Sequence, residues 1–130
     1  MLNRQEVFNT VYTKLREQGK RSIVRLKNMP PHCMYRGEGG TRRAIGHLIP
    51  DELYSEELEG QAIKTSYHTT KKVSIKEVLN KVFGELTELD IHFLSELQYA
   101  HDAWKDATLC TLNENFRRVT KEFSLEFNDA

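Results

Sequence analysis

The side chains best suited to chemistry are few and widely spaced along the chain. His32 and Cys33 are adjacent, His47 follows, and His101 and Asp102 form a second adjacent pair. A thiol beside an imidazole that a carboxylate orients is the arrangement of cysteine hydrolases, so Cys33 with His47, oriented by His101 or Asp102, is one candidate site. The thiol and imidazoles are also potential zinc ligands, but their spacing does not indicate a metal centre. We therefore expect no catalytic residues, no metal site and no cofactor.

A second group of candidates is cationic. Three arginines lie on or beside the glycine-rich turn 37–40: Arg36, Arg42 and Arg43. Adjacent guanidinium groups bind a carboxylate or a phosphate through parallel hydrogen bonds, so these residues are candidates for contacting a ligand or partner. The competing interpretation is internal pairing with the carboxylates that follow in sequence: Asp51, Glu52 and Glu59.

A pocket would arise if the fold gathered five of the polar candidates: Tyr35, Arg36, His47, Glu59 and His101. Such a pocket would suit a small-ligand- or nucleotide-binding protein, or a hydrolase, and it requires the five side chains to converge on one concave, partly exposed site. We expect Tyr35, Arg36 and Glu59 to form one bonded cluster, either as a structural lock or as part of the pocket. The sequence contains no P-loop, dinucleotide-binding glycine motif, HExxH, CxxC or GxSxG.

Length and charge limit the classes of protein. The chain has 130 residues and no net charge, which predicts a single domain over residues 1–130. Residues 1–50 carry ten basic and three acidic side chains, a net +7, and residues 51–130 carry a net −7. One interpretation of this asymmetry is that the two halves present opposite surface potentials, which steer partners. The other is that the two halves fold against each other, so that their electric fields partly cancel. The oligomeric state does not follow from either interpretation.

The basic half lacks the features of a dedicated nucleic-acid-binding module. It has no zinc-finger spacing, no basic-region heptad and no dense basic run interleaved with aromatics, so nucleic-acid binding through residues 4–43 is a minor hypothesis. No stretch approaches the ~20 apolar residues of a membrane span, which predicts no membrane association. Cys33 and Cys110 lie far apart and cannot form a disulfide framework, so a reducing cytoplasm is expected.

Capping residues and apolar periodicity predict the elements that position these candidates. Four helices are expected, from Asn3 to Gly19, from Ser74 to Gly84, from Thr87 or Asp90 to Trp104, and from Thr111 onward. Short helical turns are expected to begin at Asp51 and Ser55, and the polar residues 61–72 to form an exposed loop.

The strands are short and cluster in the first half. Residues 33–36 and 41–49 are predicted to pair around the glycine-rich turn, with residues 22–26 as a further short strand. The predicted fold is therefore α+β. It has a small antiparallel sheet of two or three strands, centred on a hairpin at residues 33–49, packed with four or five helices, and its C-terminal half is helical.

Several of these residues recur in a recognisable order. The pattern comprises Cys33-x-Tyr35-Arg36-Gly37, Ala44-Ile45-Gly46-x-Leu48-Ile49-Pro50-Asp51-Glu52-x-Tyr54 and Leu58-Glu59-Gly60. It is flanked by Gln18-Gly19-Lys20-Arg21-Ser22 and by Phe93-Leu94-Ser95-x-Leu97-Gln98-x-Ala100-His101-Asp102. This pattern covers most of the chain and resembles a family of small uncharacterised proteins encoded by tailed bacteriophages and prophages.

The resemblance implies an origin rather than an activity. It implies a phage or prophage accessory protein that acts in the cytoplasm of an infected bacterium, and the leading hypothesis is that it binds and inhibits a host protein, such as a defence or gene-expression component, without catalysis. Many relatives carry a cysteine where Arg43 stands here and a shorter link at residues 24–32. Loss of that cysteine argues against a cysteine-based metal site or disulfide in this member.

Overall fold

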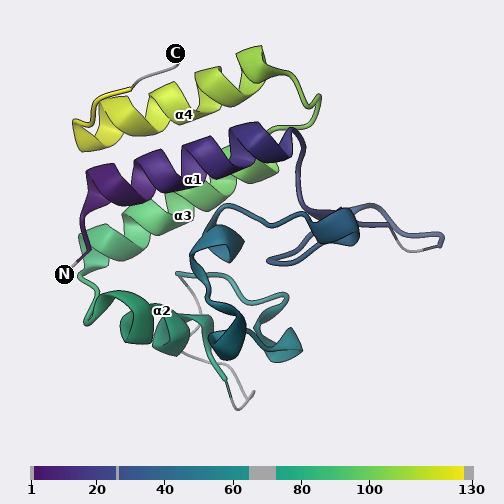
Figure 1. Cartoon of the computed structure of the whole chain (residues 1–130), viewed down its shortest axis with the longest axis horizontal. Helices are drawn as coiled ribbons and strands as arrows, with labels where there is room; N and C mark the ends of the chain where they lie inside the picture. Colours follow the sequence, from purple (N-terminus) through teal and green to yellow (C-terminus); the bar gives the residue numbers. More distant parts are fainter. Residues whose placement is uncertain (1, 26, 65–72, 128–130) are drawn as a thin grey trace.

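A computed structural model describes residues 2–25, 27–64 and 73–127 (Figure 1). These residues form four α-helices, α1 (Arg4–Gln18), α2 (Ile75–Phe83), α3 (Glu88–Asp102) and α4 (Leu109–Phe123), together with strands β1 (Ile23–Val24) and β2 (His32–Cys33). The two strands pair antiparallel, with Ile23 opposite Cys33 and Val24 opposite His32. The predicted α+β class is confirmed. None of the described helices is long and apolar enough to cross a membrane.

Helix α1 forms as its sequence predicts. The Asn3 side chain caps the helix by accepting a hydrogen bond from the Glu6 N–H at 3.0 Å, and Gly19 ends it with φ 79°, a conformation that favours glycine. The predicted apolar stripe is buried along one face: Val7, Phe8, Val11, Tyr12 and Leu15. This face therefore anchors the hydrophobic core.

Much of the core lies between α1, α3 and α4, which run side by side in Figure 1 and contact one another, and α2 adds Ile75, Val78 and Leu79 to it. Phe116 of α4 packs against Phe8 and Tyr12 of α1, with ring centroids 5.7 and 5.8 Å apart. The first and last described segments are also joined, because Gln5 exchanges two hydrogen bonds with the backbone of Glu126. The first and last helices of the chain thus form one packing unit.

The predicted hairpin at residues 33–49 is only partly correct. Around the glycine turn a single bridge joins Arg36 to Arg42, and the expected second strand is instead a 3₁₀-helix, η2 (Ile45–Leu48). The regular pairing lies earlier, between β1 and β2. The short turns predicted at Asp51 and Ser55 do form, as the 3₁₀-helices η3 (Asp51–Leu53) and η4 (Glu56–Leu58).

Two further predictions need correction. Helix α4 is capped by Thr108 rather than Thr111, because the Thr108 hydroxyl oxygen accepts the Thr111 N–H at 3.2 Å. In the predicted exposed loop 61–72, residues 65–72 lie outside the described part, but Gln61 and Ile63 are buried. The Gln61 amide bonds to backbone groups at both ends of this segment, including Glu57 O at 2.7 Å and Ile75 N at 3.0 Å.

Candidate functional site

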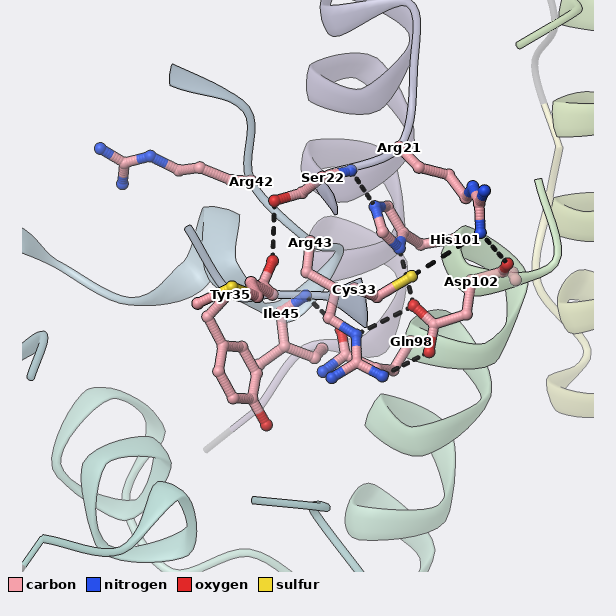
Figure 2. Close-up of polar contacts among 12 residues, drawn as sticks. Arg21, Ser22, Cys33, Tyr35, Arg42, Arg43, Ile45, Gln98, His101 and Asp102 are labelled. Carbon is pink, nitrogen blue, oxygen red and sulfur yellow. Dashed lines mark hydrogen bonds and ion pairs between the residues drawn. The ribbon is translucent and has the colours of Figure 1, made fainter. Parts of the chain in front are cut away.

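The largest gathering of candidate residues lies at the C-terminal end of α3 (Figure 2). Thr87 and Asp90 form a reciprocal capping box that starts α3, and the helix then carries His101 and Asp102 toward the β1–β2 strands. His101 is fully buried and Asp102 is about three-quarters buried. Cys33 on β2 and Arg43, after the glycine turn, complete the group, which we call the Asp102 cluster.

Hydrogen bonds fix the tautomer of His101. Its Nε2 lies 2.9 Å from the backbone N–H of Ser22, which can only donate, so Nε2 carries no proton. The proton is then on Nδ1, which donates to Asp102 Oδ1 at 2.8 Å. Burial lowers the pKa of His101 below its ordinary value, more than Asp102 raises it. His101 is therefore a neutral side chain that holds the segment before β1, not a free general base.

Asp102 is the ionised centre of this cluster. Arg43 donates from Nε to Oδ1 at 2.9 Å and from Nη2 to Oδ2, a bidentate ion pair. Burial alone would raise the pKa of Asp102, but the hydrogen bonds from His101 and Arg43 outweigh it and hold the pKa at about 2. Arg21 also reaches the backbone carbonyl of Asp102 at 3.3 Å.

Cys33 is protonated at neutral pH. Burial raises the pKa of its thiol, and the charge and hydrogen bond of Asp102 raise it further, more than Arg21 and Arg43 lower it. A ligand atom of Cys33, one of His101 and one of Asp102 all lie within 4.8 Å of one another. Both ring nitrogens of His101 already have partners, so neither is free to activate the thiol or to hold a metal.

The sequence hypothesis of a Cys33–His47 pair is wrong, since the imidazole beside Cys33 is that of His101. His47 instead lines an open hollow with Lys14 and Arg42. Its pKa is lowered to about 4, mainly by burial and also by the positive charges of Arg42 and Lys14.

A second cluster forms around Glu59, as predicted. Glu59 accepts hydrogen bonds from the backbone N–H groups of Tyr35 and Arg36 at 2.8 and 3.1 Å, and from the Tyr54 hydroxyl at 2.7 Å. Tyr35 is fully buried, and its hydroxyl donates to the carbonyl of Gln61 at 2.7 Å. Glu59 thus holds the segment after β2 in place.

The cationic candidates divide between two carboxylates. Arg36 and Arg42 contact Asp51 Oδ1 at 2.5 and 3.4 Å, whereas Arg43 pairs with Asp102. The guanidinium of Arg36 also lies over the Tyr54 ring, 4.1 Å from its centroid. All three arginines are thus paired internally, but only Arg36 and Arg42 use a carboxylate that the sequence interpretation named, since Arg43 pairs with Asp102 instead.

The five side chains of the hypothetical pocket do not converge on one site, although Glu59 binds the backbone of Tyr35 and Arg36. Tyr35 and His101 are buried in the core, Glu59 is occupied by backbone groups, and His47 faces a different hollow. What the structure does bring together is His101, Asp102, Arg43 and Cys33. The sequence search overlooked Gln98, one turn before Asp102, whose Oε1 accepts the Ile45 N–H at 3.1 Å and fastens η2 to α3.

Tyr99 was also not singled out from the sequence, although its position on α3 predicts an exposed side chain. It falls off the apolar stripe of α3, and 60% of the residue is exposed. It lies at the border of two hollows, one reaching Arg43 and Asp102 and the other lying between α3 and α4.

Comparison with protein-family models, curated proteins and solved structures found no match for this chain.

Proposed function

We propose that this chain is a phage or prophage accessory protein that binds a host bacterial protein in the cytoplasm of the infected cell and inhibits it without catalysis. The phage origin rests on the sequence pattern described above. The non-catalytic mode is supported by the Asp102 cluster, in which His101, Arg43 and Asp102 are each engaged by other groups of the protein and the Cys33 thiol is protonated.

The observation that carries the proposal is the exposed side chain of Tyr99. Tyrosine is enriched at the energetic centres of protein interfaces, where an aromatic ring enters a partner and a polar rim surrounds it. Tyr99 has such surroundings: a hollow of about 220 Å³ lies on one side and a smaller one on the other. Charged side chains border these hollows: Arg43, Lys64, Glu96, Asp102, Arg118 and Glu122. We call this area the Tyr99 surface.

The test is affinity purification from a nuclease-treated bacterial lysate with tagged wild-type protein and two variants. We expect wild type to retain a host protein in stoichiometric amount, identified by mass spectrometry. Tyr99→Ala should weaken binding of the purified partner about 30-fold, the equivalent of the ~2 kcal/mol typical of an interface hot spot.

The matched control is Leu89→Ala, since Leu89 lies on the same helix and is 51% exposed, but lines neither of the two hollows. It should bind as wild type does, and both variants should melt within about 2 °C of wild type because an exposed side chain contributes little to stability. Equal binding by Tyr99→Ala and Leu89→Ala would show that the Tyr99 surface is not part of the interface. Failure to retain any protein from several bacterial hosts would contradict the proposed function itself.

A further inference from the structure

Two adjoining hollows are lined mostly by residues of the basic half of the chain. None of these residues belongs to the Tyr99 surface, although Arg21 contacts the backbone of Asp102. One, of about 540 Å³, lies between β1 and the residues that follow α3, and the other, of about 600 Å³, between the end of α1 and the glycine turn. They share Lys20 and Thr41 in their linings, and we call the pair the double groove. Six cationic side chains line it: Lys14, Lys20, Arg21, Arg25, Arg42 and Lys105.

Most of these cations lack a carboxylate partner in the part of the chain that the structure describes, although Arg21 donates to the backbone carbonyl of Asp102. Within the described part of the chain, Arg42 is the only one of the six within 4.0 Å of a carboxylate. Arginines elsewhere are used structurally, as in the pairs of Arg4 with Asp90 and of Arg43 with Asp102. Two acidic residues, Glu17 and Glu38, also line the double groove, leaving a local excess of four positive charges. Unpaired cations on a concave surface create a potential that attracts anions.

The low pKa of His47 is consistent with this local field. Burial is its main cause, but the positive charges of Arg42 and Lys14 contribute separately. Both of those residues line the double groove with His47. The imidazole of His47 thus lies in a region where the existing positive charges disfavour its protonation.

The lining of the double groove favours contact with phosphates over contact with unpaired bases. Proteins that hold single strands stack the bases on exposed aromatic rings. Among the described residues lining the double groove, the one aromatic is Trp104, which is 2% exposed and donates its indole N–H to the carbonyl of Thr108 at 2.8 Å. Without an accessible ring, binding must come from charge, and a duplex presents phosphates at the higher density.

The β1–β2 connection extends the basic surface. Figure 1 shows this connection projecting from the helical body, and Arg25 at its start and Lys27 further along are both exposed. Arg25 also lines the double groove, so the projection begins where the groove ends. Lys27 therefore adds an exposed cation to those that line the double groove.

From these observations we infer that the double groove binds double-stranded DNA through its phosphate backbone, without reading base sequence. The residues of the double groove and those of the Tyr99 surface do not overlap. The inference is therefore independent of the proposed protein partner, and a protein with both surfaces would bring a host protein to DNA.

The test uses fluorescence anisotropy with the full chain and a labelled 20-base-pair duplex over a range of salt concentrations. We expect binding at low salt, with log K falling against log salt at a slope of about −5, since each phosphate contact contributes about −0.9. Lys20→Ala, Arg25→Ala and Lys105→Ala combined should reduce the magnitude of the slope by about 3 and weaken binding at least ~10-fold.

The control replaces three exposed lysines outside the double groove, Lys76, Lys81 and Lys121, with alanine, which changes net charge equally. It should retain nearly wild-type affinity, and circular dichroism should give both triple variants the wild-type spectrum. Equal loss in the two triple variants would overturn the inference, as would no binding at low salt. Tighter binding of a single strand of the same length, or of polyglutamate as a model acidic protein, would also overturn it.

Discussion

At the scale of single residues, Asp102 is the most consequential side chain in the molecule. It accepts hydrogen bonds from His101 and Arg43, and it adds to the effect of burial in raising the pKa of the Cys33 thiol. The chain brings Arg43 to Asp102 across 59 positions of sequence. This group is a structural lock that joins the glycine-turn region to α3.

Replacement of Asp102 by asparagine should weaken this lock in two measurable ways. The change removes the negative charge opposite the partly buried Arg43, so the free energy of unfolding should fall by about 2 kcal/mol in urea denaturation. It also removes the two effects of Asp102 that raise the Cys33 pKa, so the pH midpoint of thiol alkylation should move down.

Both proteins in that comparison should carry Cys110→Ser, because Cys110 is exposed and would react first. Leu79→Ala, a core change in α2, provides a control with comparable or greater loss of stability. An alkylation midpoint that moves equally in the Leu79 variant would mean that Cys33 reports unfolding rather than the charge of Asp102.

The sequence was informative about some residues and silent about others. The bonds of Glu59 to Tyr35 and Arg36, and the contact of Asp51 with arginines, were predictable from residue type and proximity along the chain. The Arg43–Asp102 pair was not, because a bidentate contact between distant segments depends on how α3 packs.

At the scale of elements, η2 shows most clearly where tertiary contacts outweighed local preference. The β-branched residues Ile45 and Ile49 favour a strand. In the fold, however, both are buried, four positions apart, and η2 packs against both α1 and α3. Gly46 allows this arrangement, since a Cβ there would lie 2.1 Å from the carbonyl oxygen of Tyr35. Helices α1, α2 and α3 were predictable because their caps and apolar stripes agree.

Gly46→Ala should therefore be strongly destabilising, by about 3 kcal/mol or more, because the added methyl group meets backbone and cannot be relieved by a side-chain rotation. The measurement is chemical denaturation, with Gly19→Ala as the control. Gly19 has the left-handed conformation (φ 79°, ψ 1°) but open space around its Cβ position, so its replacement should cost only about 1 kcal/mol of backbone strain. Similar losses in the two variants would contradict the close approach of Gly46 to Tyr35.

At the scale of the whole molecule, two imidazoles make stability depend on pH. His47 and His101 are held neutral in the fold with lowered pKa values, about 4 for His47, whereas unfolded histidine ionises near pH 6.5. Below pH 6.5 the unfolded chain therefore binds more protons than the folded one, and stability falls as pH drops toward 4. Asp102, with a pKa of about 2, retains its stabilising charge throughout this range.

We expect the melting temperature to fall between pH 7 and pH 4.5, by about 4 °C for each 1 kcal/mol lost. In His47→Gln, which cannot be protonated, this fall should be smaller. His32→Gln is the control, since His32 is exposed at the edge of the small sheet and should leave the pH dependence unchanged. An unchanged pH dependence in His47→Gln would assign the whole effect to other groups.

The packing of α1 on α4 has a consequence for synthesis on the ribosome. Phe8 finds its partner in Phe116, so the apolar stripe of α1 emerges long before the helix that covers it. At about 5–20 residues per second, roughly 5–20 s pass between the two. Throughout that interval η2 and α3 can cover α1 only in part, so the nascent chain presents apolar surface of the kind that chaperones bind before translation ends.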